Sequence, residues 1–344
     1  MGILKLLAKA MLAAATLTAV SCWSPLFDQN ISLAALASAK MSLDAQFDAS
    51  LNGSSSTNVV YFAVPSRERT PTNVAVFTLS AMSYGMTVYS NSGGNWASTG
   101  NNSGTSYDSP LSDPELVSIQ AGGPGSLYPL AVFFPTLSSG TVQIVDTSSS
   151  SKLTSITPSV PTQIFGLTSF PKQSESDVNF IGSTGSSNQN YLTTASSSYA
   201  TASTSGLNFT ASESYGWYAY DETNDIGYLT HYSQDSSGNY KSEGLTSGTG
   251  VVASWNRKDH VVAFLTTGKL LTREGGYYDV CDGQGNIQYS FPAGSLKFAG
   301  EYYDSNQVAR CSFTQVIPLG GGKSNSQQRI RVYSIATSNL SSLK

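Results

Sequence analysis

From residue 58 onward, short apolar runs alternate with clusters of Gly, Ser, Asn and Asp. The runs are rich in β-branched and aromatic residues, as β-strands bounded by turns are. The clearest are Asn58–Val64, Asn73–Leu79, Pro129–Phe134, Thr141–Val145, Ile164–Phe170, Asp177–Ile181, Tyr215–Tyr220, Ile226–Tyr232, His260–Leu265, Tyr277–Cys281, Arg310–Ile317 and Arg329–Ile335. No long, capped helix pattern follows residue 50, so the chain is predicted to be all-β.

The runs group into units of similar length. The units can be cut at 58–110, 115–161, 162–206, 207–249, 250–297 and 298–338. A period of about 40–50 residues is typical of propeller blades, each a four-stranded sheet. Thr141–Ile156 resembles the strand–turn–strand signature of YVTN-type propeller repeats. We predict a six- or seven-bladed β-propeller, with β-sandwich domains as the alternative.

Ring closure is predicted from the cost of open sheet edges. A propeller is usually closed by pairing strands from the two chain ends, which leaves no exposed edge. On this reasoning Arg329–Ile335 is predicted to lie beside Asn58–Val64.

The first residues have the pattern of an export signal. A basic segment, Met1–Lys9, precedes the apolar stretch Ala10–Val20, which is too short to span a bilayer. Ala19-Val20-Ser21-Cys22 resembles the lipobox of bacterial lipoproteins, in the relaxed form that spirochaetes tolerate. The resemblance implies cleavage before Cys22 and lipidation of its thiol. The alternative is an ordinary secretory signal, with Ala37-Ser38-Ala39 as a distant cleavage site.

Three segments follow from these patterns. Residues 1–21 are predicted to be the lipoprotein signal peptide and residues 58–344 the propeller-like domain. Residues 22–57 are predicted to be a tether, with a short helix within Ile31–Phe47 and a flexible linker at Leu51–Thr57.

Composition narrows the classes of partner. Only 12% of the residues are charged, 40% are hydrophobic, and the net charge is −4. This balance gives no electrostatic footprint for nucleic acid. No second apolar run is long enough for a membrane span, so the predicted membrane contact is the lipid anchor alone.

The two cysteines beyond the leader, Cys281 and Cys311, are a candidate disulfide. An even number of thiols in an exported protein favours one bridge. The alternative is two separate buried thiols, since free cysteine packs as a small apolar residue.

Catalytic and metal-binding patterns are absent from the sequence. The two histidines, His231 and His260, belong to no recognisable triad or metal motif, and no cofactor is predicted. The oxygen-rich string Asp221–Asp225 is interpreted as a polar hairpin turn in preference to a Ca²⁺ site. Five acids could supply a glycosidase pair, but no spacing marks any two as partners: Glu213, Asp221, Glu274, Asp279 and Glu301.

Aromatic residues are the enriched group with a functional interpretation. The candidates for ligand binding are Trp217, Tyr218, Trp255, Tyr277 and Tyr278. Exposed Tyr and Trp offer rigid contact area with a polar tip, which suits glycans and proteins. Packing between blades is the alternative use of the same side chains.

These expectations together predict a lipid-anchored envelope protein, placed at the outer membrane because Trp23, and no Asp, follows Cys22. The leading hypothesis is a binding or scaffold module for a protein or glycan partner, and not an enzyme. The alternatives are an envelope glycoside hydrolase and a structural component of outer-membrane assembly.

Overall fold

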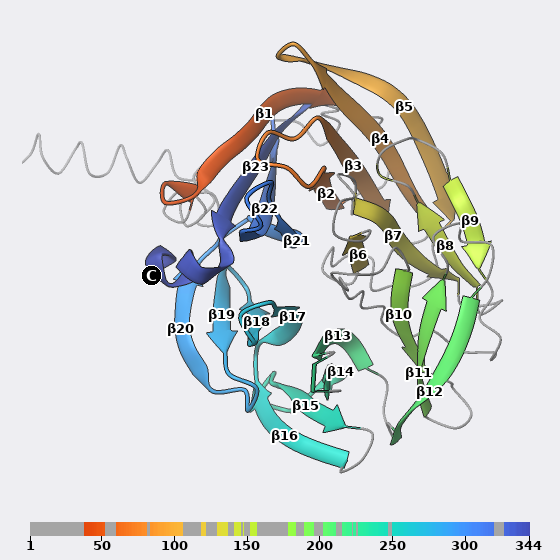
Figure 1. The fold of residues 1–344 in the computed structure, drawn as a ribbon, viewed down its shortest axis with the longest axis vertical. Coiled ribbons are helices and arrows are strands. Elements are labelled where there is room, and N and C mark those ends of the chain that lie inside the picture. The colour runs from red at the N-terminus through yellow and green to blue at the C-terminus, as the bar shows by residue number, and fades with distance from the viewer. Residues whose placement is uncertain are drawn as a thin grey trace, which may run out of the picture.

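The computed structural model of the protein describes residues 38–51, 60–80, 83–105, 118–121, 129–136, 141–145, 147, 152–156, 178–183, 189–195, 202–210, 215–221, 223–224, 226–246, 250–319 and 327–344. These residues form six antiparallel sheets arranged around a central axis (Figure 1). The outermost strands lie on the rim of the ring. The described part of the chain is therefore a six-bladed β-propeller, as the length of the repeating units predicted.

The first three blades follow one another along the chain. Blade 1 contains β2 (Val60–Pro65), β3 (Asn73–Ser80), β4 (Ser83–Ser92) and β5 (Asn95–Thr105). Blade 2 contains β6 (Ser118–Ala121), β7 (Pro129–Thr136), β8 (Thr141–Val145) and β9 (Lys152–Ile156). Blade 3 contains β10 (Val178–Ser183), β11 (Gln189–Ala195) and β12 (Ala202–Thr210) among the described residues. The run Ile164–Phe170 lies outside them.

The last three blades are described most completely. Blade 4 contains β13 (Tyr215–Asp221), β14 (Ile226–Gln234), β15 (Tyr240–Thr246) and β16 (Gly250–Arg257). Blade 5 contains β17 (His260–Leu265), β18 (Lys269–Glu274), β19 (Tyr277–Cys281) and β20 (Ile287–Pro292). Blade 6 contains β21 (Lys297–Tyr303), β22 (Ala309–Pro318), β23 (Gln327–Ala336) and β1 (Ser42–Ser50). The predicted cut at residue 249 was wrong, because β16 is the outer strand of blade 4.

Burial along the strands follows their place within a blade. In β22, the six positions from Arg310 to Gln315 are all buried, because neighbouring blades cover both faces of a middle strand. In the outer strand β1, buried Phe47 and Ala49 alternate with exposed Asp48 and Ser50. Among the described residues, the apolar core forms separate clusters between blades 4 and 5, blades 5 and 6, and blades 6 and 1.

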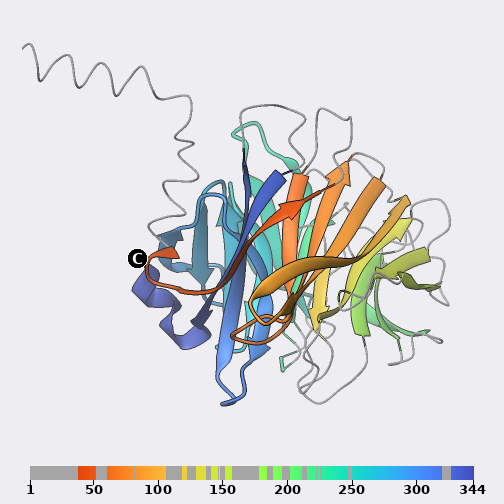
Figure 2. The same cartoon turned by 90° about the horizontal axis from the view of Figure 1, so that it is seen from above.

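The ring is closed by the N-terminal strand β1, which pairs antiparallel with β23 (Figure 2). Phe47 lies opposite Ile330, and Asp48 lies opposite Arg329. Arg329 donates to both carboxylate oxygens of Asp48, at 2.7 and 2.9 Å. The two chain ends therefore share one blade, and no edge of β23 remains unpaired.

The prediction about which N-terminal strand closes the ring was wrong. Ring closure joins β23 to Ser42–Ser50, and not to Asn58–Val64, which contributes the inner strand β2. Of the segment Ile31–Phe47, in which a short helix was predicted, residues 31–37 lie outside the described residues, and Ser42–Phe47 belong to strand β1. The strand buries the alternating apolar side chains of Phe47 and Ala49 in the core between blades 6 and 1. The propeller thus includes residues assigned to the tether.

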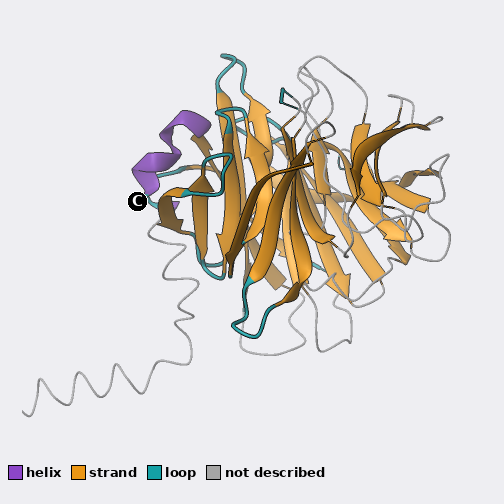
Figure 3. Cartoon of the chain, turned by 90° about the horizontal axis from the view of Figure 1, so that it is seen from below, coloured by secondary structure: helices purple, strands orange, loops and turns teal. Residues whose placement is uncertain are grey.

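A short C-terminal helix reinforces the closure. The 3₁₀ helix η3 (Thr337–Leu343) lies at the rim of the ring (Figure 3) and buries Leu340 and Leu343 in the cluster between blades 5 and 6. Met41, directly before β1, joins the same cluster. Lys40 Nζ donates to the carbonyl oxygens of Ser342 and Lys344, both at 2.7 Å, so the segment preceding β1 also holds the end of η3.

Candidate functional site

A hollow of about 420 Å³ lies where blades 5, 6 and 1 meet. It is lined by the start of β2, the far end of β22, the β18–β19 turn and the β20–β21 loop. The lining residues are Tyr61, Phe62, Arg273, Gly275, Gly276, Gly294, Ser295, Lys297, Thr314 and Val316. Its volume falls within the range of about 300–1,000 Å³ typical of small-molecule sites.

Arg273 shapes one wall of the hollow. Its Nε donates to the carbonyl of Gly275 (3.1 Å), and Nη2 donates to that of Gly294 (3.0 Å). Nη1 donates to the carbonyl of Leu296 (2.8 Å) and to the Tyr278 hydroxyl (2.6 Å). These four acceptors are neutral, and they tie the β18–β19 turn to the β20–β21 loop. The guanidinium is thereby held in one orientation, although its side chain is long.

The local sequence explains why Arg273 has these acceptors. Arg273 is directly opposite Tyr278 across the β18–β19 hairpin, and its guanidinium carbon lies 4.8 Å from the Tyr278 ring centroid. Gly275 has φ +54°, so the two-residue turn takes a conformation that L side chains rarely adopt. The turn brings the Gly275 carbonyl back onto the arginine that precedes it by two positions.

The rest of the lining is polar or aromatic. Thr314 Oγ1 donates to the carbonyl of Ala63 (2.9 Å), which joins blade 6 to blade 1. Ser295 Oγ accepts a hydrogen bond from Gln315 Nε2 at 2.9 Å. Tyr61 and Lys297 are half-buried, and burial raises the pKa of the Tyr61 phenol. Both charged residues of the lining are basic, and none of the described residues that line the hollow is acidic.

The predicted aromatic residues do not gather on one surface. Trp217 is buried and stacks on His260, with ring centroids 4.5 Å apart. Trp255 packs in the same cluster, between blades 4 and 5. Tyr278 is fully buried behind Arg273, while the neighbouring Tyr277 is 46% exposed. The side chain of Tyr218 lies outside the described part of the structure. Most of these rings therefore serve packing between blades, and the hollow uses Tyr61 and Phe62 instead.

The predicted disulfide was wrong, because Cys281 and Cys311 are both free and buried. Cys281 Sγ accepts a hydrogen bond from Arg257 Nη2 at 3.4 Å. Cys311 Sγ lies 3.5 Å from Thr337 Oγ1, in the cluster between blades 5 and 6. Burial raises the pKa of both thiols, so the thiolate form is disfavoured. Cys22 and residues 1–21 lie outside the described residues.

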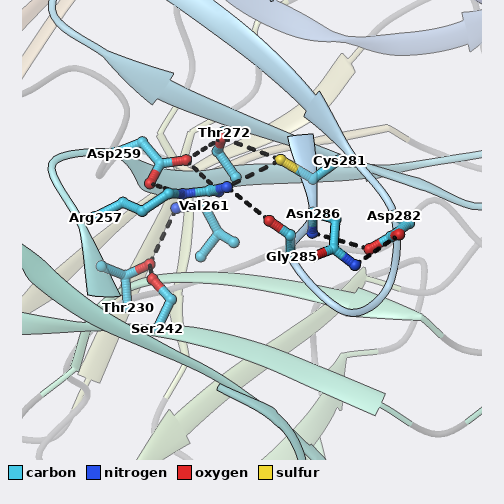
Figure 4. A network of polar contacts seen from close by, with 10 residues as sticks. All are labelled: Thr230, Ser242, Arg257, Asp259, Val261, Thr272, Cys281, Asp282, Gly285 and Asn286. Carbon is cyan, nitrogen blue, oxygen red and sulfur yellow. Dashed lines mark hydrogen bonds and ion pairs between the residues drawn. The ribbon is translucent and has the colours of Figure 1, made fainter. Parts of the chain in front are cut away.

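Cys281 belongs to a buried network that joins strands of blade 5 to the end of blade 4 (Figure 4). Arg257 donates to both carboxylate oxygens of Asp259, at 2.8 and 2.6 Å, and to the carbonyl of Gly285, at 2.6 Å. The Thr272 hydroxyl donates to the same Asp259 carboxylate. Each polar group here has a partner, so the network fixes how β16, β17, β18 and β19 meet.

An Asp-centred turn recurs in blades 4, 5 and 6. The carboxylates of Asp235, Asp282 and Asp304 each accept the N–H of the residues two and four positions later, at 2.8 to 3.1 Å. Two of these turns share the pattern Asp-x-x-Gly-Asn, at 235–239 and 282–286. Hydrogen bonds from Asn239 and Asn286 lower the pKa of Asp235 and Asp282. The recurring turn was visible in the sequence as spacing, and it sets hairpin geometry, not ligand binding.

The two Asp-x-x-Gly-Asn turns offer a matched test of packing. Gly285 and Gly238 have nearly equal φ values, +80° and +78°. A Cβ on Gly285 would lie 2.4 Å from the Trp255 ring, whereas one on Gly238 would meet no atom within 4 Å. We expect Gly238→Ala to lower the free energy of unfolding by about 1 kcal/mol, and Gly285→Ala to lose about 1–2 kcal/mol more. Urea denaturation of both variants measures the difference; equal losses would contradict the contact with Trp255.

A second junction of blades 5, 6 and 1 surrounds Glu301, toward the other end of β21 from Lys297. The Glu301 carboxylate accepts hydrogen bonds from the Thr266 N–H (2.9 Å) and hydroxyl (2.7 Å), and from the Thr337 hydroxyl (2.6 Å). Arg67 Nη2 donates to the backbone carbonyl of Glu301 at 3.3 Å. Burial raises the pKa of Glu301, and the hydrogen bonds from Thr337 and Thr266 offset only part of this effect.

The raised pKa of Glu301 predicts a pH-dependent stability. Above the ordinary glutamate value of 4.5, the folded chain holds this proton more tightly than the unfolded chain does. Stability is therefore lost as the pH rises through the folded pKa, and it is regained as the pH falls toward 4.5. We expect wild type to gain thermal stability relative to Glu301→Gln as the pH is lowered from 7 to 4.5. Melting curves of both proteins across this range test it; a constant difference would contradict it.

The histidines and the candidate glycosidase acids do not form a catalytic group around the hollow. His231 Nε2 lies 3.0 Å from Glu243 Oε2, both buried within blade 4. Asp221 accepts the N–H of Thr223 (3.0 Å) and Asn224 (3.2 Å), as a polar hairpin turn does. Asp221, Glu274, Asp279 and Glu301 do not line the hollow, and Glu213 lies outside the described residues.

Across the ranges given above, no three His, Cys, Asp or Glu side chains gather closely enough to hold a metal ion. Among those residues, no helix is both long and apolar enough to cross a membrane.

Comparison with known proteins shows similarity in three dimensions only. No protein-family profile matches the chain, and no curated protein is similar to it in sequence. The Dos1 propeller is 10% identical with a TM-score of 0.41, covering 87% of this chain and 96% of that one. The WD40 propeller domain of Doa1 is 10% identical with a TM-score of 0.37, covering 87% and 98%. A Bacteroides caccae protein of unknown function is 8% identical with a TM-score of 0.38, covering 73% and 81%.

Similarities this low carry no argument about this chain. The assignment to the β-propeller class rests on the order and pairing of its own strands: six antiparallel sheets among the described residues, with β1 from the N-terminal side completing the last of them.

Proposed function

We propose that the chain is a lipid-anchored envelope protein whose propeller binds a protein or glycan partner. The observation that carries the binding role is the hollow between blades 5, 6 and 1. Its lining includes the basic side chains of Arg273 and Lys297 and the half-buried phenol of Tyr61. The hollow is formed by loops and strand ends on a rigid ring, which is where propellers and other β folds position binding groups. We also propose that Thr141–Ile156 is a propeller repeat of the YVTN type, which its sequence resembles.

The chemistry of the lining favours binding over hydrolysis. A glycosidase needs two carboxyl groups facing one substrate, whereas the charged residues among the described lining of the hollow are Arg273 and Lys297. Envelope glycan or protein recognition therefore fits the described residues better than the hydrolase alternative. The outer-membrane assembly alternative has no separate observation in its favour.

The proposal that the protein is anchored to a membrane rests only on the sequence pattern of its first 22 residues. The apolar stretch Ala10–Val20 followed by Ser21-Cys22 supports lipidation of the Cys22 thiol. Two or three acyl chains, at about 0.8 kcal/mol per buried CH₂, would hold the protein stably at a membrane. The strand β1 begins twenty residues after this cysteine, so a tether of that length would connect the anchor to blade 6.

Cys22→Ala is expected to abolish acylation and release the protein from membranes. Metabolic labelling with a fatty acid, followed by detergent phase partitioning of wild type and variant, measures both effects. Cys281→Ala is the matched control. The Cys281 thiol is buried, so its replacement should leave the partitioning of the protein unchanged. Equal partitioning of wild type and Cys22→Ala into the aqueous phase would contradict the anchor.

Partner binding at the hollow is tested by photocrosslinking in intact cells. A photoreactive amino acid placed at Ser295, which lines the hollow, is expected to capture the partner. The control position is Ser305, which is exposed and follows the other end of β21, on the opposite side of blade 6. Adducts of equal yield at both positions, or at neither, would contradict binding at the hollow.

A further inference from the structure

We draw no further inference here: the strongest candidate, the outer edge of strand β5 (Asn95–Thr105) in blade 1, is a long run without a charged residue or proline that pairs with β4 alone among the described residues, and nothing in the structure shows what covers it.

Discussion

A chain that begins at Asn52, and so lacks β1, is expected to lose more than about 5 kcal/mol of stability, comparable to the whole stability of many domains. The deletion removes Phe47, Ala49 and Leu51 from the core between blades 6 and 1. It also leaves β23 as an unpaired outer edge, which favours aggregation.

The loss should be cooperative and not confined to blade 6. Phe47 stacks on Trp96 of blade 1, with ring centroids 4.3 Å apart and planes 13° from parallel. Tyr89, also of blade 1, donates its hydroxyl to the carbonyl of Ser50 at 2.8 Å. β1 thus contributes contacts to two blades, and its removal opens the ring at the point where the chain ends meet.

Circular dichroism melting compares this deletion with a chain that begins at Ser38 and keeps β1. The longer chain should melt like a chain that begins at Cys22. Point variants grade the effect: Phe47→Ala should lose about 3 kcal/mol, while Leu43→Ala, which is 53% exposed on the same strand, should lose less than about 0.5 kcal/mol. An unchanged midpoint for the chain from Asn52 would show that closure contributes little.

Asp259→Asn is expected to lower the free energy of unfolding by about 3 kcal/mol, because it leaves the Arg257 guanidinium partly buried without its carboxylate. Asp259 is 1% exposed, and it accepts hydrogen bonds from both Arg257 and Thr272. The Arg257 side chain is 22% exposed, so water partly solvates the guanidinium that loses its carboxylate. The expected loss of stability therefore lies at the low end of the range for buried ion pairs.

The chain provides its own control for this prediction. Arg329 and Asp48 make a bidentate pair of the same kind, at 2.7 and 2.9 Å, but these side chains are 36% and 45% exposed. Asp48→Asn should cost much less stability than Asp259→Asn, because water screens an exposed pair. Chemical denaturation of both variants gives the comparison. Equal losses of unfolding free energy in the two variants would mean that burial does not determine how much the Arg257–Asp259 pair stabilises the fold.

Propeller architecture was predictable because strand patterns are local. Runs such as His260–Leu265 and Tyr277–Cys281 have the composition of strands, and both are strands with the same bounds. The spacing of the runs also predicted blades, since several hairpin turns, such as those at Asp235–Asn239 and Asp282–Asn286, carry Gly, Asn or Asp where the backbone requires them. Strand β1 was missed because its helical and alternating patterns overlap, and only the partner β23 decides between them.

The residues that line the hollow were less predictable for a related reason. Trp217 and Tyr278 were candidates on residue type, yet both are buried, because the next blade covers the face on which they lie. Arg273 and Lys297 are separated in sequence by a complete hairpin and loop, and no spacing rule joins them. The same holds for Cys281 and Cys311, whose even number favoured a bridge, whereas each thiol packs in a different cluster between blades.

The sequence by itself determined the all-β class, the approximate number of blades and the leader pattern ending at Cys22, because these depend on neighbouring residues and on period. Tertiary structure alone decided which strand closes the ring, which aromatic rings are buried, and that Arg273, Lys297 and Tyr61 line one hollow. Those features depend on contacts between blades 5, 6 and 1, whose residues are far apart along the chain. Such contacts follow from how blades pack, which local patterns do not specify.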